Sequence, residues 1–178
     1  MEEKIYTHTT PLDEQGIKQV KHLIDLLGSR SGTEREAARK EIVAYGKLAT
    51  PYLVEALKSD NHFVRWESAK ALGVLADPAS AMALVKTLMD EDVGVRWLAS
   101  EGLIALRDTA IEPLLHGMVK NFNSIWFRQG CYHVLHVFER ESLLDTSTQE
   151  VLEALRSIEP QVSVPGVAER ALEKREKT

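Results

Sequence analysis

Apolar and small side chains recur along this 178-residue chain with a period of about 31 residues. Within one period they occur at i, i+4, i+7, i+8 and i+11, which places them on one stripe of an α-helix. The stripe appears twice in nearly identical form, as Val64, Ser68, Ala71, Leu72 and Leu75, and as Val95, Ala99, Gly102, Leu103 and Leu106. The pattern predicts one amphipathic helix per period, with small residues in mid-stripe that let a second helix approach closely.

An arginine marks the same position in each of four successive units. The spacings are 30, 31 and 32 residues, and the four are Arg35, Arg65, Arg96 and Arg128. Four residues before each arginine stands a side chain able to accept a hydrogen bond from a free amide of a first helical turn, namely Ser31, Asn61, Asp92 and Ser124. Each unit is therefore predicted to open with an N-cap.

A second helix is predicted downstream in each unit, beginning near Pro51, Pro78 and Pro113, because proline is tolerated in a first helical turn. Each unit is then a helical hairpin that buries both sides by stacking on its neighbours. We expect an all-α fold, an α–α superhelix of about four hairpins with terminal capping helices, in a single domain over residues 1–178. The expected parts are an N-terminal cap over 12–30, repeats over 31–59, 60–90, 91–121 and 122–158, and a C-terminal cap over 159–178. In the fourth repeat, residues 147–158 are expected to be the second helix, and 164–174 a final helix.

Composition and charge argue against several classes of partner. The formal net charge is −5, so the chain lacks a bulk positive field that would attract phosphate backbones, and we expect no nucleic-acid partner. No apolar run approaches the ~20 residues that span a bilayer, and the charged start does not resemble a secretion signal. The single cysteine, Cys131, cannot form an intramolecular disulfide. We expect a cytoplasmic protein with no membrane partner.

Two segments, NHFVRWESAKALGVLADPASAMALVKTLMD and EDVGVRWLASEGLIALRDTAIEPLLHGMV, resemble the HEAT repeats first described in phycobilisome lyases. The resemblance implies the solenoid fold, which hosts scaffolds, bilin lyases, a diiron hydroxylase and DNA repair enzymes. The hydroxylase carries His-Glu pairs just after the Val-Arg position. Here the pairs are Trp66-Glu67 and Trp97-Leu98, so the sequence argues against that enzyme.

The arginine ladder is expected to be structural. A guanidinium beside the buried stripe faces the adjacent repeat, where it can bridge helix-end carbonyls and the carboxylates of Asp60, Glu91 or Asp92. Trp66 and Trp97 each follow a ladder arginine and lie almost opposite the stripe, with Ile104 on the same outward face. Either the rings lie flat over neighbouring aliphatic chains, or they form a partner-binding surface. For the latter we predict Trp66, Trp97, Ile104, Gln129 and His133.

A metal site is not expected in the fourth repeat. The helical wheel sends Cys131 toward the core but His133 and His136 outward, so three ligands do not converge. The sequence also shows no Gly-rich phosphate loop, nucleophile elbow or HExxH pair. We therefore predict a non-catalytic scaffold or adaptor that binds another protein and needs no cofactor. The alternative is a bilin-lyase-like or other cofactor-handling accessory protein.

Overall fold

The helices begin where the capping residues of the sequence pattern predict. In the computed structural model, which describes residues 11–177, the side chains of Ser31, Asn61, Asp92 and Ser124 each accept a hydrogen bond from a first-turn amide. Such a cap contributes about 1 kcal/mol to helix stability. The prediction of four N-caps is confirmed.

Residues 11–177 form ten α-helices and three short 3-10 helices, and contain no strand. The α-helices are α1 (Glu14–Leu26), α2 (Gly32–Ala44), α3 (Thr50–Ala56), α4 (His62–Leu75), α5 (Ala81–Thr87), α6 (Val93–Ala105), α7 (Ile111–Asn121), α8 (Ile125–Arg140), α9 (Thr146–Leu155) and α10 (Pro160–Arg175). The 3-10 helices η1 (Gly46–Ala49), η2 (Pro78–Ser80) and η3 (Arg107–Ala110) connect the two helices of a hairpin.

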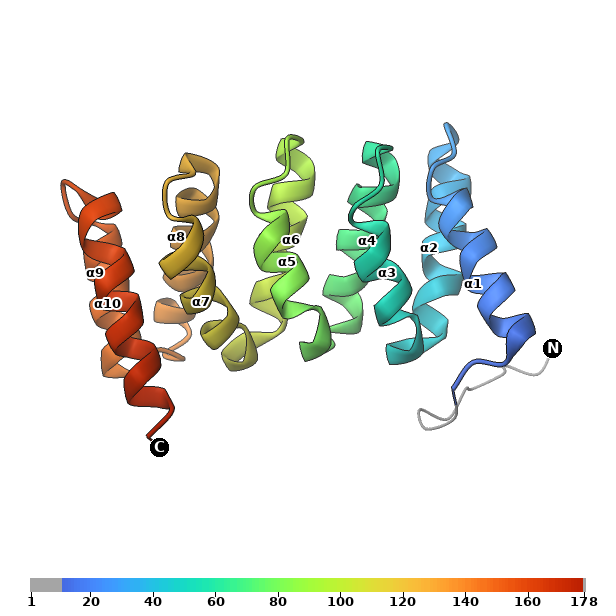
Figure 1. The fold of residues 1–178 in the computed structure, drawn as a ribbon. Helices are drawn as coiled ribbons and strands as arrows, with labels where there is room; N and C mark the ends of the chain where they lie inside the picture. Colours follow the sequence, from blue (N-terminus) through green and yellow to red (C-terminus); the bar gives the residue numbers. More distant parts are fainter. Residues whose placement is uncertain (1–10, 178) are drawn as a thin grey trace.

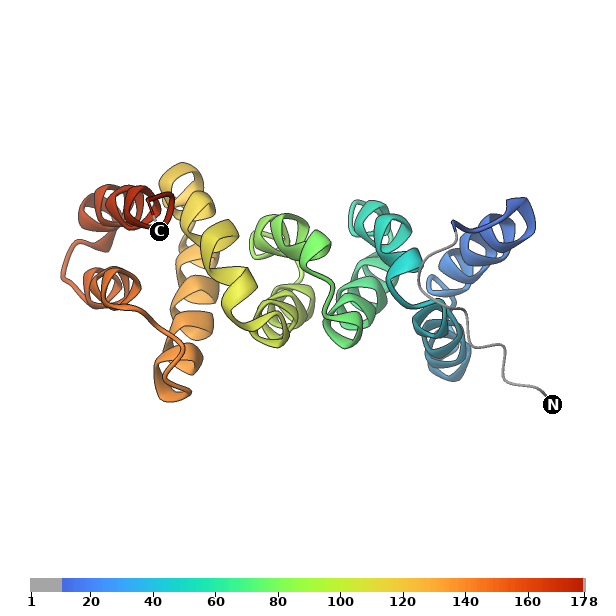
Figure 2. The same cartoon turned by 90° about the horizontal axis from the view of Figure 1, so that it is seen from below.

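The helices stack in two layers along an elongated molecule (Figure 1). One layer holds α1, α3, α5, α7 and α10, and the other holds α2, α4, α6, α8 and α9, as the view from below also shows (Figure 2). Within the second layer, α4 packs on α2 and α6, and α8 packs on α6. The predicted all-α superhelix is confirmed.

The last hairpin differs from the prediction. We expected residues 147–158 to be the second helix of the fourth repeat, in the layer of α7. Instead α9 packs beside α8, and α10 takes the place on α7 (Figure 2). The final helix also begins at Pro160, so that Pro165 lies inside it. Both helices are amphipathic, and the longer α10 covers the apolar end of the α7 layer with Val164, Ala168, Ala171 and Leu172.

Small residues set the spacing between adjacent units. A Cβ atom built on Gly73 of α4 would lie 3.3 Å from the Cα of Gly102 on α6, so the two backbones approach closely there. On Gly102 a Cβ would lie 3.0 Å from Leu84 of α5. One apolar core runs the length of the stack, from Val20 to Leu172. No helix in residues 11–177 combines the length and apolarity that a bilayer crossing requires.

Candidate functional site

The four ladder arginines contact the chain in the same way. Each Nη1 donates to the backbone carbonyl six residues earlier, at 2.7 to 2.9 Å, and so ties the turn before a helix to that helix. The acceptors are the carbonyls of Ser29, Ser59, Asp90 and Phe122. These carbonyls follow the second helix of the preceding hairpin and lack a helical partner. The ladder thus satisfies the helix-end carbonyls between units.

One of the expected carboxylates, that of Glu91, pairs with the ladder, and Asp90 is an additional partner. Arg65 binds Asp90 with two hydrogen bonds of 2.8 and 3.1 Å and reaches Glu91 at 3.1 Å. Hydrogen bonding to Asp90 raises the pKa of the Arg65 guanidinium above its usual value. Asp60 offers Arg65 only its backbone carbonyl, at 3.3 Å, and the Asp92 side chain caps α6. Of the three expected carboxylates, Glu91 therefore pairs with the ladder, whereas Asp60 offers a backbone oxygen and Asp92 serves as a helix cap.

Glu67 is the acidic member of the Trp66-Glu67 pair that was compared above with the His-Glu pairs of the hydroxylase. Its side chain is 4% exposed, and it accepts a hydrogen bond from Arg39 at 2.8 Å while Arg35 lies 3.4 Å away. Two guanidiniums compensate the buried carboxylate and tie α2 to α4. Glu67 is therefore committed to a contact between repeats.

The predicted partner-binding residues fall into two groups. Trp97 is 55% exposed, and its ring lies 4.8 Å from that of His133, whose Nε2 is 3.1 Å from Glu101. The exposed Gln129 lies one turn before His133 on α8. The structure therefore brings Trp97 and His133 together across α6 and α8, with Gln129 one helical turn away on α8.

Trp66 and Ile104 do not join this group as expected. Lys70 lies 4.8 Å above the Trp66 ring, and the indole nitrogen would be 3.1 Å from a Cβ on Gly94, so α6 partly covers the ring. Ile104 is partly buried and packs against the core. The Trp66 ring therefore lies against neighbouring atoms, as the first expectation for the tryptophans had it. The Trp97 ring is exposed, as the second expectation requires.

Sequence reasoning missed Trp126 of α8. It is 43% exposed, and the guanidinium of Arg96 lies 4.5 Å from its ring centre. The neighbouring Ile125 is 57% exposed and Val93, at the start of α6, 70%. The sequence carried a signal for Trp126, because the position two residues before a ladder arginine is aromatic at Phe63 and Trp126 and glycine at Gly94. In the structure Arg35 stacks on Phe63 at 4.1 Å, as Arg96 stacks on Trp126.

We call the exposed apolar side chains at the N-terminal ends of these two helices the α6–α8 patch; it consists of Val93, Trp97, Ile125 and Trp126. Arg96 lies within it, and Gln129 and His133 border it on α8. Aromatic and arginine side chains together are the composition that protein interfaces favour at their energetic centre.

Cys131 and the two histidines of α8 lie in separate environments. Cys131 is fully buried, and burial raises the pKa of its thiol well above the usual value. His136 stacks on Tyr132, with 5.6 Å between ring centres, and its Nδ1 lies 3.4 Å from Glu139. Within residues 11–177, no three side chains of His, Cys, Asp or Glu are placed to hold one metal ion.

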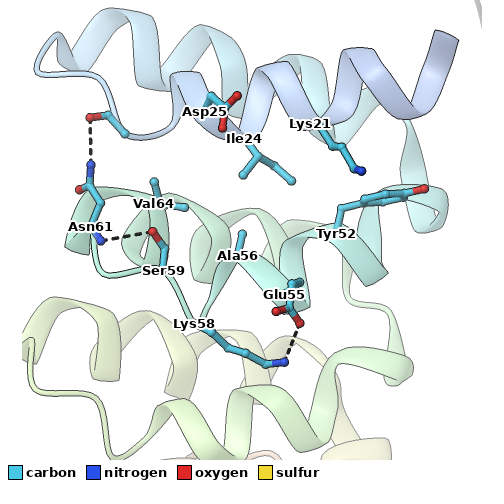
Figure 3. Close-up of a pocket in the computed structure, with 11 residues that line it drawn as sticks. Lys21, Ile24, Asp25, Tyr52, Glu55, Ala56, Lys58, Ser59, Asn61 and Val64 are labelled. Carbon is cyan, nitrogen blue, oxygen red and sulfur yellow. Dashed lines mark hydrogen bonds and ion pairs between the residues drawn. The ribbon is translucent and has the colours of Figure 1, made fainter. Parts of the chain in front are cut away.

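A groove crosses the opposite layer, between α1 and α3 (Figure 3). Its volume is about 680 Å³, with Ile24, Ala56 and Val64 among its apolar lining and Tyr52 at one end. Charged side chains border it, including Lys21, Asp25, Glu55 and Lys58, the last two paired at 2.6 Å. The sequence pattern gave no indication of this groove, since its lining comes from two separate hairpins.

The family comparison matches residues 20–104 to a model described as HEAT repeats. Among solved structures, a chain in the complex of CpcE and CpcF of phycocyanin lyase from Nostoc sp. PCC7120 is similar to this chain, with 22% identity and a TM-score of 0.58. The similarity covers 87% of this chain and 98% of that one. No curated protein sequence matches. Residues 20–104 thus match HEAT repeats, and the two-layer helical stack of the whole described chain is similar in fold to that phycocyanin lyase structure.

Proposed function

We propose that this chain is a non-catalytic scaffold or adaptor that binds another protein through the α6–α8 patch. The single observation that carries the proposal is the grouping of Trp97 and Trp126, 55% and 43% exposed, on adjacent helices around Arg96. Isolated exposed apolar residues are ordinary on protein surfaces, but several exposed apolar side chains on two adjacent helices are typical of an interaction site.

The patch suits a protein partner for energetic reasons. Aromatic rings carry a large apolar area and lose little side-chain entropy when they are ordered, and Trp, Tyr and Arg are over-represented among residues that dominate binding energy. The patch stands on α6 and α8, whose inner faces are fixed in the core by Val95, Ala99, Phe127 and Cys131. A rigid support keeps the anchors in place, so binding orders few groups.

The solved relative supports this proposal in one respect. That structure is a complex of two protein chains, so a solenoid of this fold is seen there with a protein partner. A likeness at 22% identity carries no partner identity to this chain.

The proposal is tested by affinity capture from the source lysate, with the wild-type chain beside a Trp97→Ala, Trp126→Ala double variant. A double variant at Met82 and Ile158, which are 46% and 100% exposed away from the patch, serves as the matched control. We expect the patch variant to lose a protein that the wild type and the control both retain. Equal retention by all three would contradict the patch as the binding surface.

A second candidate function is the handling of a planar cofactor, as in bilin lyases. The observation that favours it is the α1–α3 groove, whose volume of about 680 Å³ lies within the range of small-molecule sites and whose border offers Tyr52 and the cations Lys21 and Lys58 (Figure 3). Titration with a bilin tests this role by visible absorption. A saturable spectral change that Tyr52→Ala abolishes supports it, and an unchanged spectrum rejects it.

A further inference from the structure

The four ladder arginines provide an internal comparison, because all are held in one orientation. Each Nη1 donates to the carbonyl six residues earlier, and Arg65, Arg96 and Arg128 also donate to the carbonyl five residues earlier, at 3.0 to 3.3 Å. The remaining edge of each guanidinium, which carries Nε and Nη2, is not used by these carbonyls.

This remaining edge is occupied in the first two units. At Arg65 it holds the Asp90 carboxylate in a two-bond pair, with Glu91 at 3.1 Å from Nη2. At Arg35, Nε lies 3.4 Å from the Glu67 carboxylate of α4 and forms an ion pair without a hydrogen bond. A carboxylate thus lies beside this edge twice, and at Arg65 hydrogen bonds hold it there.

The same edge has no carboxylate in the next two units. Nε and Nη2 of Arg96 and of Arg128 make no hydrogen bond or ion pair with any residue in 11–177. The cause is in the sequence, because the positions equivalent to Asp90 and Glu91 carry Phe122 and Asn123 one unit later. The carboxylates that satisfy Arg65 are therefore missing for Arg96.

The surroundings of Arg96 favour a ligand from outside the chain. Its guanidinium lies 4.5 Å from the Trp126 ring centre, and this ring and the neighbouring Trp97 are 43% and 55% exposed. A guanidinium stacked on an aromatic face still presents its edge for paired hydrogen bonds. An arriving carboxylate would bind that edge, and apolar side chains next to it would cover Trp97 and Ile125.

We infer that the edge of Arg96 binds a carboxylate of an acidic, apolar-flanked segment in a partner protein, with Trp97 and Trp126 as the adjoining apolar contacts; this assignment rests on the protein-binding role proposed above. A protein carboxylate fits better than a nucleic-acid backbone. Glu91 and Glu101 stand nearby with 83% and 45% exposed side chains, and the chain carries a net charge of −5. A polyanion would be repelled, whereas a single carboxylate matches the Asp90 pair.

The test restores the missing carboxylate within the chain. Asn123→Glu places an acid where Glu91 stands for Arg65, and it keeps Arg96, Trp97 and Trp126 unchanged. Asn123→Gln is the matched neutral control. The probe is an array of synthetic peptides that vary independently in their Asp and Glu content and in their large apolar residues, with double-stranded DNA spots included.

The wild-type chain is expected to retain peptides in which an acidic residue adjoins a large apolar one. The affinity of the strongest peptide, measured by fluorescence anisotropy, is expected to fall about tenfold or more in Asn123→Glu and in Arg96→Gln, and to stay within about twofold in Asn123→Gln. Arg96→Lys should recover only part of the loss, since lysine lacks the paired donors.

The outcomes separate this inference from the proposed function. Retention of neutral peptides or of DNA, no retained peptide, or equal affinity in Asn123→Glu and wild type would each overturn the carboxylate assignment. In those cases, loss of a captured protein by Trp97→Ala, Trp126→Ala still supports the patch as a binding surface. If that double variant loses no protein, the proposed function fails as well.

Discussion

Replacing Glu67 by glutamine is expected to destabilise the protein by about 2–4 kcal/mol. The carboxylate is 4% exposed and is compensated by Arg39 and Arg35, whose side chains are 12% and 16% exposed. Glutamine keeps the shape of the side chain and one acceptor oxygen, but it removes the negative charge. Two guanidiniums are then left together in a poorly hydrated place between α2 and α4.

The magnitude follows from the burial of the group. Removing one member of a buried ion pair costs about 3–5 kcal/mol, because the remaining charge is uncompensated. The retained amide oxygen still accepts a hydrogen bond from Arg39, which offsets about 1 kcal/mol of that cost. Glu41→Gln, which removes the same charge from an exposed position of α2, should change stability by less than about 0.5 kcal/mol.

Urea unfolding followed by circular dichroism measures the free energy of unfolding, and amide hydrogen exchange locates the change. Because each hairpin of a solenoid contacts mainly its neighbours, we expect protection to fall most in α2 and α4 and least in α9 and α10. A loss below about 1 kcal/mol, or an equal fall of protection along the whole chain, would refute the view that Glu67 joins the first two repeats.

Three further predictions concern packing, backbone and pH. Gly117→Ala would place a Cβ 2.6 Å from Val85 in the core, so we expect a loss of about 1–3 kcal/mol in urea unfolding, and no loss would show that the core is looser than described. Ala76 ends α4 at a φ of 45°, and Ala76→Gly should therefore raise the free energy of unfolding by about 1 kcal/mol; a decrease would contradict this conformation. Burial opposes the charge on Asp145, but hydrogen bonds from Ser147 and Thr148 and the charge of Arg175 outweigh it and lower the pKa of the carboxyl. A carboxyl whose pKa is lower in the folded state stabilises the fold at pH values above its unfolded-state pKa, and this stabilisation is lost as the pH falls through its folded-state pKa. The free energy of unfolding, measured from about pH 5 to pH 3, should therefore depend less steeply on pH in Asp145→Asn than in wild type.

The hairpins and their starts were predictable because their determinants are local. A capping side chain, a ladder arginine and an apolar stripe recur within one helix of each unit, so position along the chain fixes their roles. The order of α9 and α10 was not predictable in this way. Both have an apolar face, and the choice of neighbour depends on the length and shape of the exposed end of α7 and α8.

The candidate site was also predictable only where its determinants lie within one helix. A helical wheel placed Trp66 and Trp97 outward, but it says nothing about the following unit, whose glycine at position 94 lets α6 approach Trp66 while Trp97 stays exposed. Trp126 lies beside the buried stripe of its own helix, and its contact with Arg96 across the units shows that it is part of the surface.

The charge partners depended on turn geometry. Asp60 and Asp90 both lie in the turn after a second helix, yet the Asp90 carboxylate reaches Arg65 while Asp60 offers a backbone oxygen. Asp60 precedes Arg65 in the turn before α4, whereas Asp90 lies in the turn before α6, so packing between units decides which carboxylate faces the guanidinium. Sequence spacing cannot resolve such a difference.

The central claim is that the α6–α8 patch is where a partner protein binds, and photo-cross-linking tests it most directly. A photoreactive benzoylphenylalanine is placed at Gln129, beside Trp126 and Trp97, and in a second chain at Met82 on the other layer, and the cross-linked peptides are identified by mass spectrometry. The account predicts that Gln129 cross-links to an acidic segment of one partner protein and that Met82 does not. Cross-links to that partner from Met82 and none from Gln129 would contradict it.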